Sequence, residues 1–270
     1  STDGPPSLWR VIPPSPPPPS SPPPDPYSSP FSSSANLRVA VTDCVNDASV
    51  AASLADCVDN LNTPIASWDV SNVDDFSAMF SGLNAFAADI SSWNTASATR
   101  MDEMFKDATV FNVDISGWNT GKVGRMDSMF YSASDFNKDV FSWDTAKVTN
   151  MSYMFYGASD IGTSSDFTSL WDTSAVTDMS HMFEGASQFN EDISAWNTHA
   201  VTDMSYMFYS ASDFNKDVFS WDTAKVTNMA YMFHNATKLG TSTTFTTSTW
   251  DTKIVTDMSY MFSEAIAFNG

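Results

Sequence analysis

The chain of 270 residues has few basic residues and no long apolar run. It contains 12 Lys and Arg against 32 Asp and Glu, so its net charge is -20 at pH 7. Binding of nucleic acid or of an anionic membrane surface through charge requires a basic face, so this composition argues against both. No apolar run approaches the ~18 residues of a membrane span, and no presequence is recognisable, although a cleaved signal peptide would leave no trace. We therefore expect no membrane insertion.

Proline is scarce outside the first thirty residues, which hold 13 of the 14 prolines. Such a run favours polyproline II, so we predict a stiff extended arm over residues 1–30. From Pro5 to Pro26 it would span roughly 70 Å at ~3.1 Å per residue. Its SPPPP blocks resemble those of hydroxyproline-rich cell-wall and flagellar-hair glycoproteins of plants and green algae. That resemblance implies hydroxylation and O-glycosylation, with these candidates: Pro16, Pro17, Pro18, Pro19, Pro22, Pro23 and Pro24.

Only two cysteines are present, Cys44 and Cys57, and both lie in residues 31–61. Apolar residues in the second half of this segment have helical spacing, which predicts an amphipathic helix that caps the domain after it. A disulfide between the two cysteines would tie this helix to the preceding turn and contribute about 3 kcal/mol, while two free buried thiols are the alternative. The apolar positions of the expected helix are Val50, Leu54, Cys57, Val58 and Leu61.

Residues 62–270 are periodic. Tryptophans recur in steps of 25, 25, 25, 28, 25, 25 and 29 residues, and all fifteen methionines lie eight or eleven positions after a tryptophan. A fixed period in the twenties is typical of stacked coils, and eight coils at about 4.8 Å would form a rod roughly 40 Å long. The eight tryptophans are Trp68, Trp93, Trp118, Trp143, Trp171, Trp196, Trp221 and Trp250.

Each coil contains two patterns of apolar residues. One falls at i, i+3, i+4 and i+7, as in Met151, Met154, Phe155 and Ala158, which predicts a two-turn helix. The other, within 136–143, is β-branched or aromatic and predicts a short strand. We therefore predict an α/β solenoid, a right-handed, leucine-rich-repeat-like stack in which the Met and aromatic columns form the core.

The repeat V-T-x-M-x-x-M-F-x-x-A-x-x-F-N-x-D-I-S-x-W-D-T resembles that of the Mycoplasma-type surface lipoproteins, relatives of the BspA-like leucine-rich repeats. The resemblance covers residues 61–270 and implies a leucine-rich-repeat-like fold, exposure outside the cell, and a role in adhesion or matrix contacts. It implies no catalytic residue.

No constellation of catalytic residues is recognisable. The histidines His181, His199 and His234 occupy different phases of the repeat and have no matched carboxylate or cysteine partner, and no phosphate loop or nucleophile elbow is present. We expect no enzyme activity and no cofactor.

One acidic column lies four residues before the tryptophan. Stacked carboxylates could hold Ca²⁺, which takes six to eight oxygen ligands, but Asp and Asn ladders also satisfy backbone groups at the corners of repeat proteins. We favour the structural role, because no loop clusters several carboxylates. The column comprises Asp89, Asp114, Asp139, Asp192 and Asp217.

Two N-glycosylation sequons have an allowed middle residue, at Asn150 and Asn235. Other coils carry variable polar residues at both positions. If the protein is secreted, we expect surface glycans there.

The two ends suggest self-assembly. The last coil stops at Gly270, before the segment that completes the earlier coils, and the apolar segment 7–12 precedes the stiff arm. We expect this segment of one molecule to pack onto the unfinished end of the next, which would build an open head-to-tail filament. The expected contacts are Leu8, Trp9, Val11 and Ile12 with Met261, Phe262 and Phe268.

Two functions fit these patterns. The first is a secreted structural glycoprotein, a homopolymeric fibre of a cell wall, matrix or flagellar surface. The second is a monomeric adhesin that binds glycans or proteins. A binding face should concentrate outward aromatic or charged residues on adjacent coils, whereas the outward positions are mostly Ser, Thr, Asp and Ala, so the sequence favours the fibre.

Overall fold

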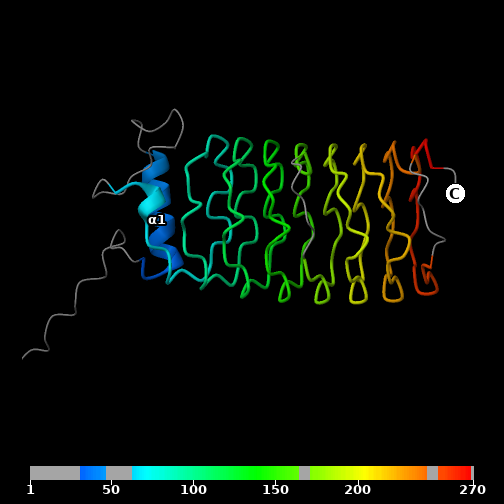
Figure 1. Cartoon of the computed structure of the whole chain (residues 1–270), viewed down its shortest axis with the longest axis horizontal. Coiled ribbons are helices and arrows are strands. Elements are labelled where there is room, and N and C mark those ends of the chain that lie inside the picture. The colour runs from blue at the N-terminus through cyan, green and yellow to red at the C-terminus, as the bar shows by residue number, and fades with distance from the viewer. Residues whose placement is uncertain (1–30, 47–62, 164–170, 242–248, 269–270) are drawn as a thin grey trace, which may run out of the picture.

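The computed structural model describes residues 31–46, 63–163, 171–241 and 249–268. A single α-helix, α1 (Ser34–Asn46), lies at one end, and the coils follow it along the long axis to the C-terminal residues at the other end (Figure 1). The predicted arm over residues 1–30 and the helix expected within 50–61 fall outside the described residues.

Helix α1 covers the first coil. Its residues Leu37, Ala40, Val41 and Cys44 have helical spacing and are at most 4% exposed, so they form the apolar face that packs on the stack. The hydroxyl of Ser33 accepts the amide of Asn36 at 3.3 Å, as an N-cap does. Helix α1 therefore precedes the expected helix, whose residues are not among those described, and Cys44 lies in α1 rather than in a turn before a helix.

The prediction of an α/β solenoid is wrong. Apart from α1, the described residues contain one short 3₁₀ helix, η1 (Ile65–Ser67), and no named strand. The expected helix at Met151–Ala158 is a series of turns, and the expected strand within 136–143 is irregular. Neighbouring coils are joined by isolated parallel bridges, one per pair of coils, from Asp75–Arg100 to Asn228–Asp257.

A ladder of backbone hydrogen bonds joins the coils. Positions are numbered here from the tryptophan of each coil, so Trp+10 is the tenth residue after it. Amides at Trp+8, Trp+10, Trp+12 and Trp+14 donate to carbonyls at Trp+7, Trp+9, Trp+11 and Trp+13 of the next coil. Between the fourth and fifth coils the bonds are Met151 N to Asp178 O (3.1 Å), Tyr153 N to Ser180 O (3.0 Å), Phe155 N to Met182 O (2.9 Å) and Gly157 N to Glu184 O (2.7 Å).

The same segment is a chain of overlapping β-turns. The amide at Trp+11 also donates to the carbonyl at Trp+8 of its own coil, as Met154 does to Met151 at 3.3 Å. The third residue of this turn, Trp+10, has a positive φ in every coil, for example 58° at Tyr153 and 59° at His181. This is the arrangement of a type II turn, and it repeats at Trp+14. Apolar residues three and four apart therefore face inward without a helix.

The core is a set of stacked columns, as the sequence predicts. The Met and Phe side chains at Trp+8, Trp+11 and Trp+12 are fully buried in the middle coils. Phenylalanines at Trp+12 lie 5.5 to 5.7 Å apart and almost parallel, as in Phe105–Phe130 and Phe130–Phe155. Tryptophan Nε1 atoms donate to carbonyls of the preceding coil, as Trp143 does to Ile115 at 3.2 Å. Burial of aromatic columns is therefore the main source of stability.

The two longer repeats keep the register of the stack. Just before the first of them, Phe141 stands two residues before tryptophan, where five other tryptophans have serine, and within it Ile161 replaces a core phenylalanine. Phe141 is fully buried and its ring stacks on Trp171, with 4.5 Å between ring centroids. Phe219 has the same position before the second longer repeat, 5.2 Å from Trp250. The near-identical stretches 136–156 and 214–234 thus supply a phenylalanine where the next coil has a smaller core residue.

The role of Phe141 in filling the core beside the smaller Ile161 is testable. Replacement of Phe141 by Ser should lower the free energy of unfolding by about 3 to 5 kcal/mol, because a fully buried ring is removed and a hydroxyl is left in the core. The control is Ser116→Ala, at the equivalent position of an earlier coil, which should lower it by at most about 1 kcal/mol, because only the hydrogen bond from the hydroxyl to Asp114 is lost. Denaturant unfolding measures both, and equal small effects would contradict this account of the longer repeats.

Candidate functional site

A ridge of stacked aromatic side chains lies on the surface of the coils. Two columns, Trp+10 and Trp+13, contain seven of the eight tyrosines and two of the three histidines of the chain. Their rings are half-buried, except that Tyr260 is 62% exposed. We call this set the ridge, and its members are Tyr131, Tyr153, Tyr156, His181, Tyr206, Tyr209, Tyr231, His234 and Tyr260.

The rings of the Trp+10 column form a continuous stack. Centroid distances are 4.2 Å from Tyr153 to His181, 4.6 Å from His181 to Tyr206, 4.7 Å from Tyr206 to Tyr231 and 4.9 Å from Tyr231 to Tyr260. The planes differ by 6° to 19°. Each ring inside the stack is therefore covered on both faces by its neighbours, and its outer edge remains available to a partner.

The Trp+13 column is interrupted by a carboxylate. Tyr131 stacks on Tyr156 at 4.4 Å, and Tyr209 stacks on His234 at 4.8 Å. Glu184 occupies the intervening coil, and its Oε2 lies 2.5 Å from Nδ1 of His181 in the other column. The two columns therefore contact each other through a polar pair as well as through tilted rings.

The environment keeps the phenols of the ridge protonated. Burial, and then the negative charge of Glu184, raises the pKa of Tyr153 above its ordinary value. The charge of Glu184, and then burial, raises the pKa of Tyr156. Burial, and then the neighbouring Tyr231, raises the pKa of Tyr206. At neutral pH these hydroxyls remain able both to donate and to accept hydrogen bonds.

The sequence analysis missed the ridge, and the signal that could have found it is the tyrosine spacing. Tyr153, Tyr206 and Tyr231 each lie ten residues after a tryptophan, which places them in one column once the coils are aligned. The expectation that outward positions are mostly Ser, Thr, Asp and Ala is therefore wrong for this face. His181 also has the carboxylate partner, Glu184, that the sequence analysis did not recognise.

The remaining histidines are not near a catalytic group. Nδ1 of His199 lies 2.9 Å from Oδ1 of Asn197 at an exposed corner. Nδ1 of His234 is buried and has no hydrogen-bond partner among the described residues. Within that part of the chain no three His, Cys, Asp or Glu side chains cluster as metal ligands would.

The acidic column four residues before tryptophan has a structural role. Each carboxylate accepts the backbone amide two residues later, at 2.9 to 3.0 Å, and so closes a local turn. The five acceptors are Asp89, Asp114, Asp139, Asp192 and Asp217.

The family of the chain follows from its repeats. The family described as Mycoplasma protein of unknown function, DUF285, matches residues 49–168 and 162–270. The chain belongs to the DUF285 family. The match agrees with the repeat resemblance and extends to neither the proline-rich arm nor its likeness to hydroxyproline-rich glycoproteins, which remains without support. Comparison with curated proteins found no match.

In this DUF285 chain the two sequons flank the ridge. Asn150 lies at Trp+7, where its Oδ1 accepts the amide of Ser152 at 2.9 Å. Asn235 lies at Trp+14 with a φ of 57°, and its Nδ2 donates to the hydroxyl of Ser210 at 3.2 Å. Glycans at these positions, which stay a prediction, would lie beside the aromatic columns.

Two further expectations concern the ends of the chain. Cys44 is 3% exposed and is in a disulfide, while Cys57, the only other cysteine, lies outside the described residues. Leu8, Trp9, Val11 and Ile12 also lie outside them. In the last coil Met261 is buried, whereas Phe262 and Phe268 are partly exposed.

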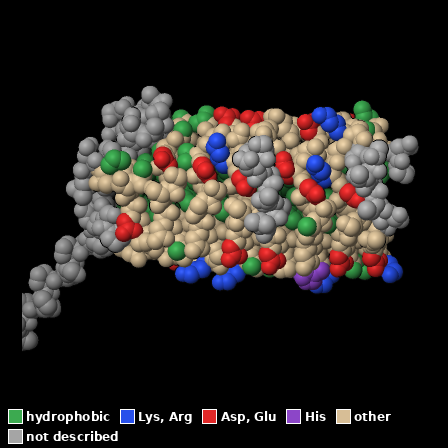
Figure 2. Space-filling view, in the orientation of Figure 1, with side chains coloured by type: hydrophobic (Ala, Val, Ile, Leu, Met, Phe, Trp, Pro, Cys, Tyr) green, Lys and Arg blue, Asp and Glu red, His purple; other side chains and the backbone are tan. Residues whose placement is uncertain are grey.

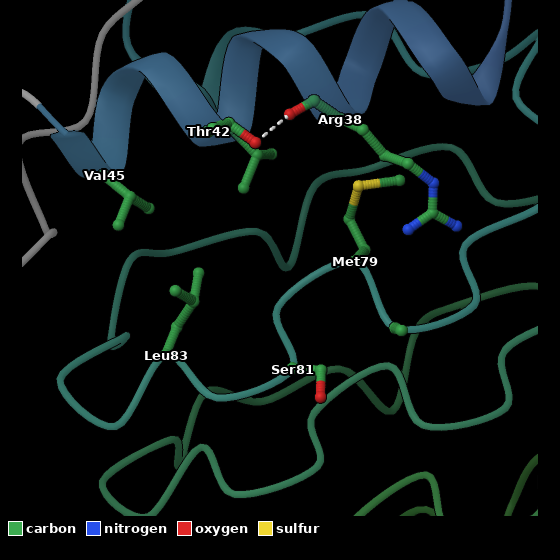
Figure 3. A pocket seen from close by; sticks show the side chains of 8 residues that line it. Arg38, Thr42, Val45, Met79, Ser81 and Leu83 are labelled. Atoms are coloured by element: carbon green, nitrogen blue, oxygen red, sulfur yellow. Dashed lines mark hydrogen bonds between the residues drawn. The ribbon is translucent and has the colours of Figure 1, made fainter.

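A groove of about 260 Å³ lies between α1 and the first coil (Figure 3). Val41 and Val45 line it on the helix, and Met79 and Leu83 line it on the coil. Its one charged side chain, Arg38, is engaged by the backbone carbonyl of Ser77. The groove therefore lacks the polar constellation of an active site. None of the described helices combines the length and apolar character of a membrane span.

The positive φ of the Trp+10 column can be tested with a matched pair. Ser128, with a φ of 56°, and Tyr206, with a φ of 58°, share this backbone geometry, but only Tyr206 belongs to the ring stack. Ser128→Gly should raise the free energy of unfolding by up to about 1 kcal/mol, because glycine relieves the left-handed strain. Tyr206→Gly should lower it by about 1 to 3 kcal/mol, because two stacked pairs are lost. Denaturant titration measures both; stabilisation by both substitutions would show that the stack contributes little.

The turn-closing carboxylates predict acid sensitivity. Hydrogen bonds from the side chain and backbone of the serine two residues later hold the pKa of Asp89, Asp114 and Asp192 below its ordinary value. Their contribution is fully present above about pH 5 and is lost as the pH falls through 4 towards the folded pKa. Burial raises the pKa of Glu191, so the contribution of this side chain to stability has the opposite dependence on pH. The midpoint of denaturant unfolding should fall between pH 5 and pH 3, and less so after replacement of the three aspartates by Asn; a midpoint constant to pH 3 would contradict this role.

Proposed function

We propose that the protein is a non-catalytic extracellular repeat protein that attaches to a macromolecular partner along the ridge. The observation that supports this most directly is the unbroken line of rings from Tyr153 to Tyr260, at 4.2 to 4.9 Å. Aromatic side chains are enriched at binding surfaces because they bury a large area at a small cost in side-chain entropy. A line of ring edges on a rod suits an extended partner better than a small molecule.

The geometry favours a polypeptide over a glycan. A sugar packs its C–H groups on an open ring face, and the inner rings of the ridge, such as Tyr206 and Tyr231, have both faces covered. The edges present phenol hydroxyls, which can donate to and accept from backbone and side-chain groups. Burial raises the pKa of the hydroxyl of Tyr206. On the face that Figure 2 shows, the hydrophobic side chains form small, separated patches among polar ones.

A location outside the cell is part of the proposal. Its support is the disulfide at Cys44, because disulfides persist in oxidising compartments.

The fibre remains a second candidate, because the last described coil exposes apolar side chains. Met258 is 43% exposed and Ile266 is 83% exposed, whereas the methionines at the position of Met258 in the six preceding coils are fully buried. At the other end α1 covers the first coil (Figure 1). Simple stacking of coil on coil is therefore blocked at that end, and a filament would need the N-terminal arm, as the sequence analysis supposes.

The attachment role can be tested with Tyr206→Ser together with Tyr231→Ser. Serine is compatible with this column, since Ser128 occupies it with a φ of 56°. The matched control is Thr202→Ser with Thr227→Ser, on an exposed column of the same two coils. We expect the labelled full chain to be retained on at least one of four bead types, coated with polylysine, gelatin, chitin or cellulose, and the ridge variant to lose at least five-fold in retention.

Three outcomes would count against this proposal. The first is no retention of the unaltered chain on any bead. The second is equal loss in the control variant. The third is the presence of fibres in electron micrographs of the unaltered chain without ridge-dependent retention, which would favour the fibre instead.

A further inference from the structure

The ridge carries charge of one sign over its five C-terminal coils. Between Trp+7 and Trp+14, the segments 150–157, 178–185, 203–210, 228–235 and 257–264 contain no Lys or Arg. They contain five carboxylates, which interleave with the rings of the ridge and give this strip a negative potential. The five are Asp178, Glu184, Asp203, Asp257 and Glu264.

The corresponding segments nearer α1 are different. Arg100 and Arg125 occupy Trp+7 there, and each is paired within its own coil, with Asp102 at 2.8 Å and Asp127 at 2.9 Å. Aspartate at Trp+9 thus accompanies arginine at Trp+7, while the coils with Asp at Trp+7 have serine at Trp+9. Arg100 and Arg125 are thus already paired with carboxylates of their own coils. The carboxylates of the five C-terminal coils have no Lys or Arg in the corresponding segments.

The carboxylates at Trp+7 are fixed in position. Oδ1 of Asp178, Asp203 and Asp257 accepts the amide of the serine two residues later, at 2.8 to 2.9 Å. None of the three forms an ion pair among the described residues, although Oδ2 of Asp203 also accepts Nδ2 of Asn228 at 3.2 Å, and the carboxylate of Glu184 contacts His181. The three aspartates are therefore fixed beside the rings at Trp+7 of the fifth, sixth and eighth coils, and they remain available to a cation from outside.

The ring at one end of the Trp+13 column contacts a cation of the chain itself. Nζ of Lys106 lies over the ring of Tyr131, 5.4 Å from its centroid, at the end of the Trp+13 column. An ammonium group is attracted to an aromatic face in this way. The amine of a lysine side chain is therefore compatible with the surface at the one end where the chain supplies it.

We propose that the acidic part of the ridge, in segments 150–157, 178–185, 203–210, 228–235 and 257–264, binds an extended basic segment of a partner protein. This inference rests on the proposed attachment function and names its partner. Lysine or arginine groups of the segment pair with the Trp+7 carboxylates, and its backbone lies along the phenol edges. The stack from Tyr153 to Tyr260 is roughly 18 Å long, which about five or six extended residues would cover. The net charge of -20 would also steer such a partner towards the protein and repel anionic ones.

The experiment uses octalysine as the probe and octaglutamate as the negative control, with binding to the full chain followed by calorimetry at low salt. The carboxylate variant carries Asp178→Asn, Asp203→Asn and Asp257→Asn. Asparagine suits this column, since Asn150 and Asn228 accept the same backbone amide at 2.9 and 3.1 Å. This substitution removes charge without removing the hydrogen bond. Because each new Asn-Met-Ser is a sequon, all forms are produced in a host without N-glycosylation.

The chain offers a control variant with the same change in charge. Asp144, Asp172 and Asp222 lie at Trp+1, at the exposed corner beyond the tryptophan, and each accepts the amide two residues later. Other coils have Asn at that position with the same bond, as in Asn94 and Asn197. Both triple variants therefore raise the net charge by three and should keep the fold, which circular dichroism and the unfolding midpoint would check.

We expect octalysine to bind the unaltered chain. The carboxylate variant should bind it at least ten-fold more weakly, and the affinity of the control variant should change by less than three-fold. Affinity should fall as salt is added, because the contacts are ionic. Equal weakening in both variants would overturn the inference, since it would show attraction to net charge alone. Absence of octalysine binding would also overturn it, and retention on beads lost only in the Tyr206→Ser, Tyr231→Ser variant would then leave the attachment function standing.

Discussion

The backbone ladder between coils is the constraint on which the rest of the structure depends. Alternate amides between Trp+8 and Trp+14 donate to the next coil, and the amides between them close turns within their own coil. Every second peptide must therefore face along the stack, which requires a positive φ at Trp+10 and Trp+14. Because the ladder fixes the register, any residue type repeated at one position becomes a straight line on the surface or in the core.

That constraint acts differently inside and outside the stack. Inside, the volume of each layer is fixed, so the smaller Ile161 is accompanied by Phe141 from the preceding coil. Outside, side chains are free to vary, and yet Trp+10 carries Tyr or His in five successive coils at a backbone geometry that glycine or asparagine adopts more easily. Stacking on both neighbours offsets part of this strain. Bulky residues held at a left-handed φ in five adjacent layers support a functional interpretation of the ridge more than an isolated exposed tyrosine would.

The columns could be predicted from the sequence, but the local structure of the coil could not. Equal spacing of Trp and of the Met-Phe pairs identifies which side chains stack and are buried, and these include Met151, Met154 and Phe155. The same i, i+3, i+4, i+7 spacing fits a two-turn helix and a chain of overlapping turns, and hydrophobic periodicity does not distinguish them. The ridge could have been predicted, because alignment of the repeats on their tryptophans places Tyr153, Tyr206 and Tyr231 in one column. The charge row needed the structure, since the pairing of Arg100 with Asp102 within one coil shows that the cations are already used.

The two longer repeats show that the ridge is kept continuous while the length of a coil changes. The extra residues fall between Trp+20 and the next tryptophan, far along the chain from Trp+10. Tyr153 and His181 stack at 4.2 Å across the first longer repeat, and Tyr231 and Tyr260 stack at 4.9 Å across the second. These distances are close to the 4.6 and 4.7 Å found between coils of ordinary length. The hydrogen-bond ladder continues through the same layers. A structural rod would need this continuity only in its core, where phenylalanines already provide it. Continuity of the half-exposed rings is what a partner that lies along several coils requires.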